Sequence, residues 1–409
     1  MQNTKLLRVA IFMTVCCLSM FACTLSTFIM QAVSYYHVSA TSAGTLESYQ
    51  NLSMIVFILG LFSLILRLGY RRSLMLIIGI MVVIAILMPL VNSYFMLKIY
   101  LIGLGLVFVA MKVVLYSTVP LTVKDESEQA MLFSLLEVFW ALASIVGMWI
   151  MAHFMQQNPQ NWLIFTWVFA AFGLVTLILW KLTHLDESAI AKESQVSFKQ
   201  QLKDIVAICN NRYLAAVILI SFLASMVEMG LGAWLPGFYK QALALPDFLS
   251  VKIASFALVA TLAGRLVVVG LLKLVSWGKA LFIYYALGLV VLVFALFTIH
   301  VSDNGVTTLS QVPLNAMLLA FFAFFLAPST PLLNSSILAR TAKEKHVLLM
   351  TVLTIIFALA SSIGARLIGQ LIDHFGVING FKIATIIPLA LLVILILPYA
   401  KFIHKGFIK

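Results

Sequence analysis

Six ionisable residues lie inside long apolar stretches of this sequence: Glu47, Lys112, Glu137, Glu228, Arg265 and Arg366. Inserting such a side chain into the centre of a bilayer costs about 2.5–3.5 kcal/mol, so those that persist usually mark a pathway or a paired site. Burial stabilises the neutral form of a carboxyl group, and a nearby cation stabilises its charged form. The chemistry that these residues could perform is therefore the uptake and release of protons.

The elements that must position these residues are membrane-spanning helices. The chain has 409 residues, of which 63% are hydrophobic and 10% are charged, and its mean hydropathy is +1.11. A soluble domain carries about 25% charged residues, so most of this exterior must meet lipid. The net charge of +12 could suggest a nucleic-acid partner, but the basic residues lie in short loops rather than in one patch.

Hydropathy predicts an all-α integral membrane protein with twelve transmembrane helices, because one crossing takes about 20 apolar residues. The expected spans are 9–36, 43–66, 73–92, 97–121, 129–153, 162–183, 212–240, 249–272, 279–300, 312–338, 347–371 and 378–401. The apolar run that follows Lys5 and Arg8 could be a signal peptide, but it is longer than the about 7–15 residues of such a segment. It therefore forms the first span.

The longest polar stretch lies between the sixth and seventh spans, at residues 184–211. It holds an amphipathic pattern at 197–206 that suits the membrane interface. We therefore expect an N-terminal six-helix bundle at 1–183, a cytoplasmic linker with a short amphipathic helix at 184–211, and a C-terminal six-helix bundle at 212–409.

Lysine and arginine are unevenly distributed between the two sides of these spans. With both termini in the cytoplasm, 19 of the 26 basic residues fall inside, four fall outside and three lie within spans. Cytoplasmic loops of membrane proteins carry such an excess. We therefore expect a multi-pass protein of the inner or plasma membrane with cytoplasmic N- and C-termini.

The two halves share a short repeated motif. Residues 141–147 read ALASIVG and residues 358–364 read ALASSIG, and basic turns at 67–72 and 277–279 are related by a similar offset. Small residues favour close helix packing in any membrane protein. Their agreement with the division into six and six helices indicates an internal repeat.

At these residues the chain resembles the major facilitator superfamily, whose fold has two six-helix halves with a cavity between them. The turn at 67–72 is similar to the family's loop between its second and third helices, with Leu66 in place of the usual acidic residue. The stretches 226–236, 264–266 and 361–376, the last with Gly369, Asp373 and Gly376, resemble the fucose–proton symporter branch. The chain lacks that branch's acidic residue in the first span, and its fourth span reads LYSTVP at 115–120 instead of a Glu-Thr-x-x-Asn-Pro-like stretch.

The resemblance places the first, fourth, seventh and tenth spans around the central cavity. Glu228 is then the expected proton-titrating carboxylate, with Glu137 as a second, and the alternative for Glu228 is a static ion pair or a polar contact in helix packing. Lys112 would contact the substrate or pair with Glu228, unless its long stem carries the ammonium to the cytoplasmic surface. A Lys112 that faces the cavity would favour an anionic, carboxylate-bearing solute.

The remaining charged residues sort by depth into two acid–base pairs. Glu137 and Arg265 lie in the cytoplasmic third of their spans, and Glu47 and Arg366 lie near the outer face. The resemblance brings the fifth span to the eighth, and the second to the eleventh, across the cleft. We expect Glu137–Arg265 to close the inner side and Glu47–Arg366 the outer side, because each state of an alternating-access protein needs contacts that the other lacks. Pairing within one half, or snorkelling of the outer pair, is the alternative.

Uncharged residues complete the expected substrate site. The candidates are polar or aromatic residues on the cavity spans: Thr24, Thr27, Gln31, Tyr116, Trp234, Tyr239, Asn334 and Ser335. Pro328 and Pro331 interrupt the tenth span, and prolines free carbonyl groups that can line a cavity. The alternatives are helix–helix hydrogen bonds for the polar residues and an outer aromatic belt for Trp234 and Tyr239.

These observations predict a secondary active transporter with alternating access, and specifically proton-coupled symport of a small polar organic solute, either sugar-like or carboxylate-bearing. The alternative is a proton-driven exporter of a drug or metabolite, and a more distant one is a membrane sensor that does not transport. The sequence has no P-loop, G-x-x-x-x-G-K-[ST], to drive transport with ATP.

We do not expect an enzyme, because the seven histidines lie at or near helix ends and neither HExxH nor GxSxG occurs. The four cysteines (Cys16, Cys17, Cys23 and Cys209) have no metal-ligand spacing, so neither a metal nor another cofactor is expected. The expected partners are a small-molecule substrate, protons and the lipid bilayer, with no nucleic acid, and the chain is expected to act as a monomer.

Overall fold

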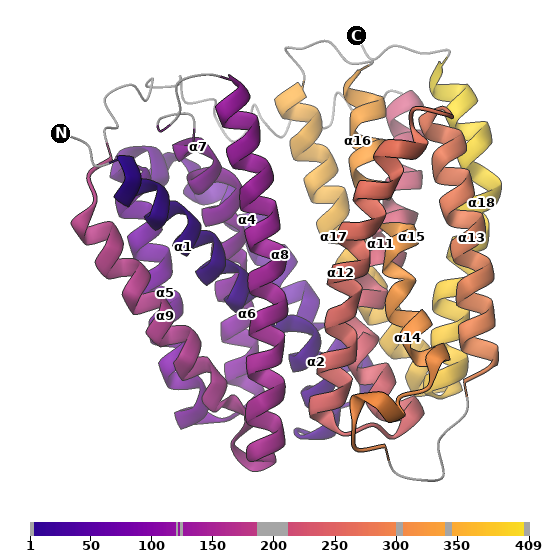
Figure 1. The fold of residues 1–409 in the computed structure, drawn as a ribbon, viewed down its shortest axis with the longest axis horizontal. Coiled ribbons are helices and arrows are strands. Elements are labelled where there is room, and N and C mark those ends of the chain that lie inside the picture. The colour runs from indigo at the N-terminus through magenta and orange to yellow at the C-terminus, as the bar shows by residue number, and fades with distance from the viewer. Residues whose placement is uncertain are drawn as a thin grey trace. The chain divides into compact units, whose positions relative to one another are not determined.

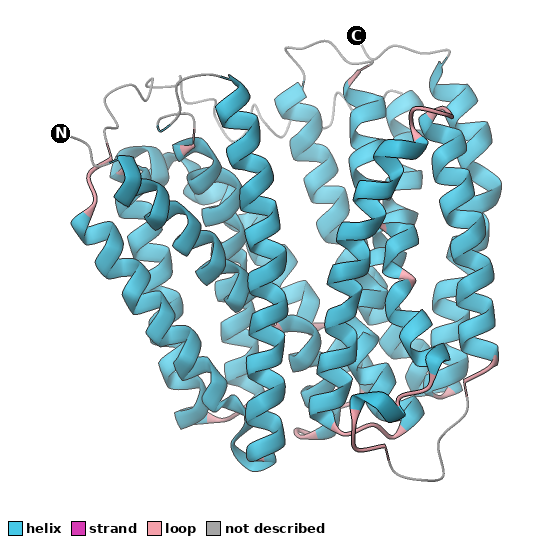
Figure 2. Ribbon diagram, in the orientation of Figure 1, coloured by secondary structure: helices cyan, strands magenta, loops and turns pink. Residues whose placement is uncertain are grey.

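The computed structural model describes residues 4–119, 122, 126–185, 212–299, 306–339 and 346–404. Over these residues the chain consists of helices joined by loops and turns, without a strand (Figure 2). The all-α class expected from hydropathy is confirmed for this part of the chain. Figure 1 labels the helices in chain order.

The helices have the following bounds: α1 (Thr4–Ala22), α2 (Leu25–Ser34), α3 (Ala40–Gly44), α4 (Leu46–Leu68), α5 (Tyr70–Val91), α6 (Tyr94–Val109), α7 (Tyr116–Thr118), α8 (Glu126–Gln157), α9 (Phe165–Leu182), α11 (Arg212–Leu243), α12 (Asp247–Leu271), α13 (Trp277–Phe297), α14 (Leu314–Phe321), α15 (Ala323–Leu326), α16 (Ser329–Leu338), α17 (His346–Phe375) and α18 (Val377–His404). Within the described residues, ten helical segments are long and apolar enough to cross a membrane. They coincide with ten of the expected spans, and α4 and α6 lie at the positions of the other two. The total of twelve spans and their orientation stay predictions.

Contacts between helices divide the chain into two compact units. Unit 1 contains Met1–Phe28 and Tyr49–Gln195, and unit 2 contains Ile29–Ser48 and Val196–Lys409. Ile29–Ser48, called the 29–48 segment below, therefore packs with C-terminal helices although it lies among N-terminal ones in the sequence. The expected linker lies outside the described residues from position 186 onward, so the bundle limits at 183 and 212 stay predictions.

Small residues let α1 and α8 approach each other closely within unit 1. A Cβ atom built on Gly147 of α8 would lie 2.7 Å from Sγ of Cys23, which directly follows α1. One turn earlier, the hydroxyl groups of Ser19 and Ser144 share a hydrogen bond of 2.6 Å, and Ser19 Oγ lies 2.5 Å from the carbonyl oxygen of Trp140. These contacts fix the rotation of α8, the helix that carries Glu137.

Facing glycines bring α11 and α17 together within unit 2. A Cβ atom on Gly364 would lie 2.7 Å from the carbonyl oxygen of Met226, and one on Gly230 would lie 3.2 Å from the carbonyl carbon of Gly364. Small residues allow helix backbones to approach in this way. The contact fixes the rotation of α11 and thereby the direction of Glu228, two residues before Gly230.

Three of the expected spans are interrupted. The first breaks between α1 and α2, where the Thr24 hydroxyl donates to the carbonyl of Phe21 at 2.9 Å. The fourth passes from α6 through a π-helical turn, η1 (Ala110–Leu115), into α7. The tenth is divided into α14, α15 and α16, with Pro328 immediately before α16. Interrupted or π-helical turns occur frequently at functional sites.

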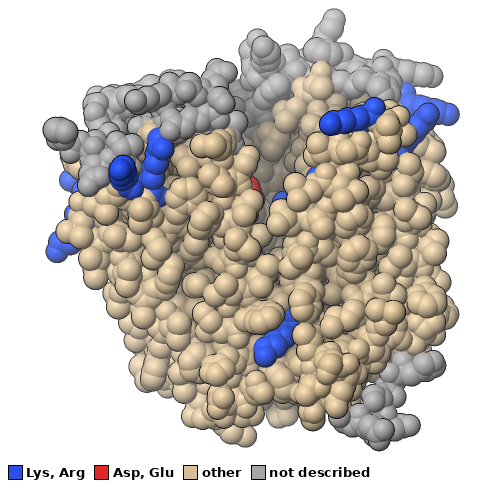
Figure 3. All heavy atoms as spheres, viewed as in Figure 1, with Lys and Arg blue, Asp and Glu red and all other residues tan. Residues whose placement is uncertain are grey.

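The face of the molecule in Figure 3 carries few charged side chains among its described residues. Large apolar residues are exposed on several helices, including Phe95, Leu182, Leu266 and Leu314. A water-soluble protein rarely exposes so much contiguous apolar surface. Contact with lipid explains it.

Candidate functional site

Glu228 lies near the middle of the apolar segment Ala215–Leu243, about 20 Å along the helix from either end at 1.5 Å per residue. Its side chain is half-buried. The hydroxyl of Thr330, at the start of α16, donates a hydrogen bond of 3.3 Å to the carboxylate. Arg265 of α12 interacts with the same carboxylate electrostatically. The carboxylate thus has one hydroxyl donor and one permanent cation from two other helices.

Further hydroxyl groups lie around this carboxylate. Tyr285 of α13 is completely buried, and its hydroxyl lies near Ser329, Glu228 and Tyr399 without a hydrogen bond to any of them. Ser329 begins α16 and Tyr399 belongs to α18. Five helices of unit 2 therefore contribute polar atoms to one cluster, which we call the Glu228 cluster: Glu228, Arg265, Tyr285, Ser329, Thr330 and Tyr399.

The backbone of α12 is held close to the tenth span beside Arg265. Gly264 faces the carbonyl of Phe324, which a side chain at this position would overlap. The hydroxyl of Tyr284 donates to the carbonyl of Gly264 at 3.1 Å, and the rings of Tyr284 and Phe324 stack with centroids 5.5 Å apart. Glycine at 264 is thus required for the approach that positions Arg265.

Unit 1 holds a second carboxylate within a span. Glu137 is exposed on α8 and accepts a hydrogen bond from the hydroxyl of Tyr116. Tyr116 directly follows η1, and its ring packs edge-on against Phe133, with the centroids 5.1 Å apart. Lys112 belongs to η1, but its side chain lies outside the described part of the chain. Its expected contacts with the substrate or with Glu228 stay predictions, as does the Glu137–Arg265 pair.

The expected outer pair involves a different contact in the structure. Glu47, at the start of α4, is buried and accepts a hydrogen bond from the hydroxyl of Ser361 on α17. Arg366 is exposed on the same helix. A Glu47–Arg366 gate stays a prediction, whereas Ser361 is a partner that the sequence did not indicate.

Several of the uncharged candidates are occupied by packing contacts. Gln31 is buried and donates from Nε2 to Asp247 at 2.7 Å. Trp234 is buried and donates to the carbonyl of Ala365 at 2.8 Å, and Tyr239 donates to the carbonyl of Ala316 at 2.8 Å. The Gln31 bond is a helix–helix contact of the kind given as its alternative, whereas the alternative for Trp234 and Tyr239 was an outer aromatic belt. Substrate contact by these three residues stays a prediction.

Other candidates keep polar atoms available. Thr27 is completely buried, and within the described residues its hydroxyl oxygen has no hydrogen-bond partner. Asn334 is half-buried on α16, one helical turn beyond Thr330. Ser335 is exposed and bonds to the carbonyl of Leu332 in its own helix. Direct contact of these residues with a substrate stays a prediction.

Sequence reasoning missed most of the Glu228 cluster. Thr330, Ser329, Tyr285 and Tyr399 are common residue types at positions without a distinctive spacing. The one available signal was the Ser329-Thr330 pair between the two prolines that interrupt the tenth span. Within the described residues, no group of three His, Cys, Asp or Glu side chains could hold a metal ion.

The sequence also matches a family model over most of its length, because the Major Facilitator Superfamily model aligns with residues 9–312. The chain belongs to the major facilitator superfamily. This superfamily consists of membrane transporters, so the general class expected from the sequence, a multi-pass membrane transporter, agrees with the match. No curated protein matches the sequence.

Solved structures of superfamily transporters share this fold. The nucleoside transporter NupG is 14% identical, with a TM-score of 0.74 over 99% of this chain and 100% of that one. A POT family transporter in complex with 5-aminolevulinic acid is 14% identical, with a TM-score of 0.72 over 97% and 96%. The fucose:proton symporter FucP of E. coli, from the branch that the C-terminal motifs resemble, is 14% identical, with a TM-score of 0.59 over 98% of both chains. Identities this low show the fold alone.

Proposed function

We propose that this superfamily member is a proton-coupled symporter that moves a small polar organic solute by alternating access, with Glu228 as the carboxylate that binds the coupling proton. The observation that carries the proposal is the position of Glu228 at mid-span, beside Arg265 and Thr330. An ionisable residue at this depth is expensive unless it has a function or a partner. The neighbours described as proton symporters include proteins for fucose and D-xylose.

The chemistry of the cluster suits a proton that must be bound and then released. Arg265 stays charged under all physiological conditions, so it attracts Glu228 only while that carboxylate is ionised. Protonation removes this attraction and converts one carboxylate oxygen from an acceptor into a donor. The contacts of Glu228 with Arg265 and Thr330 therefore differ between the two protonation states. Such a difference is what allows a bound proton to shift a conformational equilibrium.

The topology completes the proposal. We place α4 and the segment α6–η1–α7 across the membrane as the second and fourth spans, for a total of twelve, with both termini in the cytoplasm of the inner or plasma membrane. The support is the length of α4, 23 residues, and the excess of basic residues in the expected cytoplasmic loops.

Proton movement coupled to solute movement is the direct test. Purified protein is reconstituted into vesicles that contain the pH dye pyranine, and a nucleoside, fucose, D-xylose and 5-aminolevulinic acid are added outside. Symport predicts that at least one solute acidifies the interior. Glu228→Gln keeps the size of the side chain but cannot ionise, so it should lose acidification while retaining exchange of labelled solute across the membrane.

Thr354→Ala is the matched control, because within the described residues the Thr354 hydroxyl donates only to the carbonyl of Met350, one turn earlier in α17. This variant should behave as the unaltered chain does. Solute exchange without acidification in the unaltered chain would exclude proton symport. Acidification that persists in Glu228→Gln would remove Glu228 from the mechanism.

A further inference from the structure

Polar contacts at three places attach the 29–48 segment to the C-terminal helices of unit 2. The segment includes the last part of α2, the short helix α3 and the first residues of α4. At both ends the chain continues into helices of unit 1. Any rearrangement that separates the segment from the C-terminal helices must therefore break these contacts.

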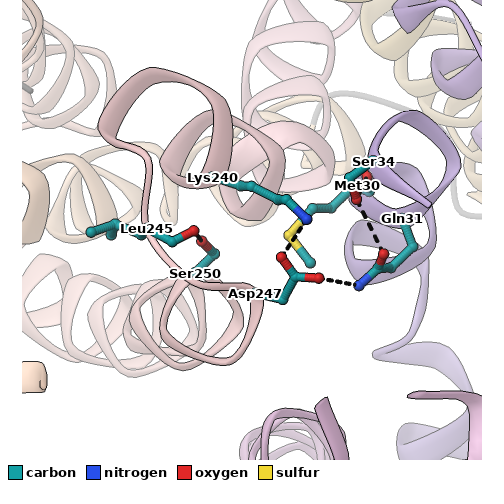
Figure 4. A network of polar contacts seen from close by, with 7 residues as sticks. All are labelled: Met30, Gln31, Ser34, Lys240, Leu245, Asp247 and Ser250. Carbon is teal, nitrogen blue, oxygen red and sulfur yellow. Dashed lines mark hydrogen bonds and ion pairs between the residues drawn. The ribbon is translucent and has the colours of Figure 1, made fainter. Parts of the chain in front are cut away.

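The first contact joins α2 to the adjacent ends of α11 and α12. Figure 4 shows the Gln31 amide and the Lys240 ammonium directed at the Asp247 carboxylate from two different helices. Gln31 donates to one oxygen of Asp247 at 2.7 Å, and Lys240 forms an ion pair with the other. Ser34 donates to Oε1 of Gln31 at 3.1 Å and holds the amide in this orientation. Asp247 thus ties α2 to unit 2.

The second contact is made by Asp373 near the end of α17. One carboxylate oxygen accepts the backbone N–H of Ala40 at 3.0 Å. The other accepts the backbone N–H of Thr41 at 2.8 Å and the Thr41 hydroxyl at 2.6 Å. The first N–H groups of a helix have no partner within the helix, and an ionised acceptor makes the stronger kind of hydrogen bond to them. Asp373 therefore supplies three hydrogen bonds to the start of α3.

The third contact is the buried bond from Ser361 to Glu47, and glycines on both sides let the backbones meet between the polar sites. A Cβ atom on Gly44 of α3 would overlap the carbonyl of Ala365, and one on Gly369 would overlap the carbonyl of Ala40. The α3–α17 interface is thus close, and Ala43 of α3 is completely buried.

We infer that Asp373 and Asp247 are gate residues, which hold the 29–48 segment on the C-terminal helices in this conformation and must release it when the outer side opens. The release of the segment during transport rests on the proposed alternating-access function. The attachment of the segment rests on the contacts described above. With both termini cytoplasmic, this interface faces the outside of the cell, at the ends of α11 and α17 and the start of α12. The residues are positioning residues and need not touch the solute.

The test measures how often the interface opens. A cysteine at Ala43, in a background without the four natural cysteines, is labelled with a membrane-impermeant maleimide in intact cells and in inside-out vesicles. Asp373→Asn weakens the hydrogen bonds, and Gly369→Ala inserts a methyl group between the two backbones while leaving every charge in place. Each should raise the labelling rate from the outside by about tenfold or more, because each disrupts contacts that the closed state needs.

Matched variants separate gate opening from general damage. Gly232→Ala makes the same substitution in α11 where nothing lies within 4 Å of the added atom, and it should leave labelling unchanged. A reporter cysteine at Ala295, buried in α13, should stay unlabelled in all variants. Should Asp373→Asn or Gly369→Ala fail to fold, Thr41→Val removes a single hydroxyl from the same contact and should give a smaller increase.

The inference would be overturned if the variants were labelled at the same rate as the unaltered background. This comparison includes Thr41→Val and whichever of Asp373→Asn and Gly369→Ala fold. Labelling from the cytoplasmic side alone would also overturn the inference, because the interface would then not be outside. Solute exchange is measured separately. Faster labelling in a protein that transports none of the tested solutes would leave the gate standing and remove the proposed transport function.

Discussion

A similar seven-residue motif occurs in each half of the chain, at 141–147 and 358–364, and the two copies differ in how tightly their glycines are packed. Gly147 of unit 1 faces the sulfur of Cys23, which is the end of a short side chain. Gly364 of unit 2 faces the backbone of Met226, both its carbonyl oxygen and, at 3.2 Å, its Cα atom. In both copies the glycine packs against the first helix of its own half. The repeat therefore specifies a helix contact, but the space beside Gly364 is more restricted than the space beside Gly147.

The serines of the two copies have diverged further. Ser144 bonds to Ser19 of α1 within unit 1, whereas Ser361, the equivalent residue, donates to Glu47 of the 29–48 segment. Glu137 and Glu228 also differ between the halves, since Glu137 is exposed and Glu228 is half-buried among groups from four other helices. The comparison teaches that repetition preserves packing positions and leaves the chemistry at them free to change.

The largest difference between the halves is expected in proton-coupled uptake, when the partners of Glu228 and Glu137 are substituted. Arg265→Gln removes the cation that acts on the charge of Glu228, so proton-coupled uptake should fall by at least about tenfold, since a nearby cation favours the ionised form of a carboxyl group. Tyr116→Phe removes one hydrogen bond from the exposed Glu137 and should change uptake by about twofold or less. Initial rates of solute-driven acidification measure both. Equal losses would show that the halves contribute equally to coupling.

The next effect is on stability and concerns the tighter glycine. Gly364→Ala places a methyl group against the Met226 backbone, which cannot rotate away, and should destabilise the protein by about 1–3 kcal/mol. Thermal unfolding in detergent, followed by loss of the monodisperse peak on size exclusion, measures the change. A melting temperature equal to that of the unaltered chain would mean that α11 and α17 can separate without cost.

A smaller effect is expected at the serine of the first copy. Ser144→Ala leaves Ser19 without this hydrogen bond, although Ser19 still lies beside the carbonyl of Trp140. Loss of one such bond should cost about 1 kcal/mol, visible in the same unfolding assay. Ser361→Ala removes the donor to Glu47 and should also accelerate labelling at Ala43. If both serine variants accelerated that labelling, the divergence between the copies would be refuted.

The smallest effect is expected at the looser glycine. Gly147→Ala brings a methyl group to Sγ of Cys23, and this sulfur can shift by rotation of one side-chain bond. The change should cost less than about 1 kcal/mol, and part of it should be offset because alanine is the better helix former. If Gly147→Ala destabilised the protein more than Gly364→Ala, the first copy of the motif would be the more tightly packed one, contrary to our expectation.

Sequence reasoning succeeded where depth in the membrane was the deciding quantity. Long apolar runs predicted the helical spans, and Glu228 stood out because a charge at mid-span has few explanations. Rotation about the helix axis cannot be read from depth, so Thr330 and Tyr285 were missed although they lie beside Glu228. Asp247 and Asp373 were missed for another reason. Each lies at the end of a helix, where an acidic residue usually faces water, and only the fold brings the 29–48 segment to them.

The π-helical turn η1 has a consequence for the residues that follow it. Such a turn holds one residue more than an α-helical turn, and one residue corresponds to about 100° of rotation about the axis. If η1 tightened into an α-helix, α7 would swing around by that angle and Tyr116 would be turned away from the partner that it now contacts on α8. A twist confined to six residues could thus couple or uncouple α7 and α8.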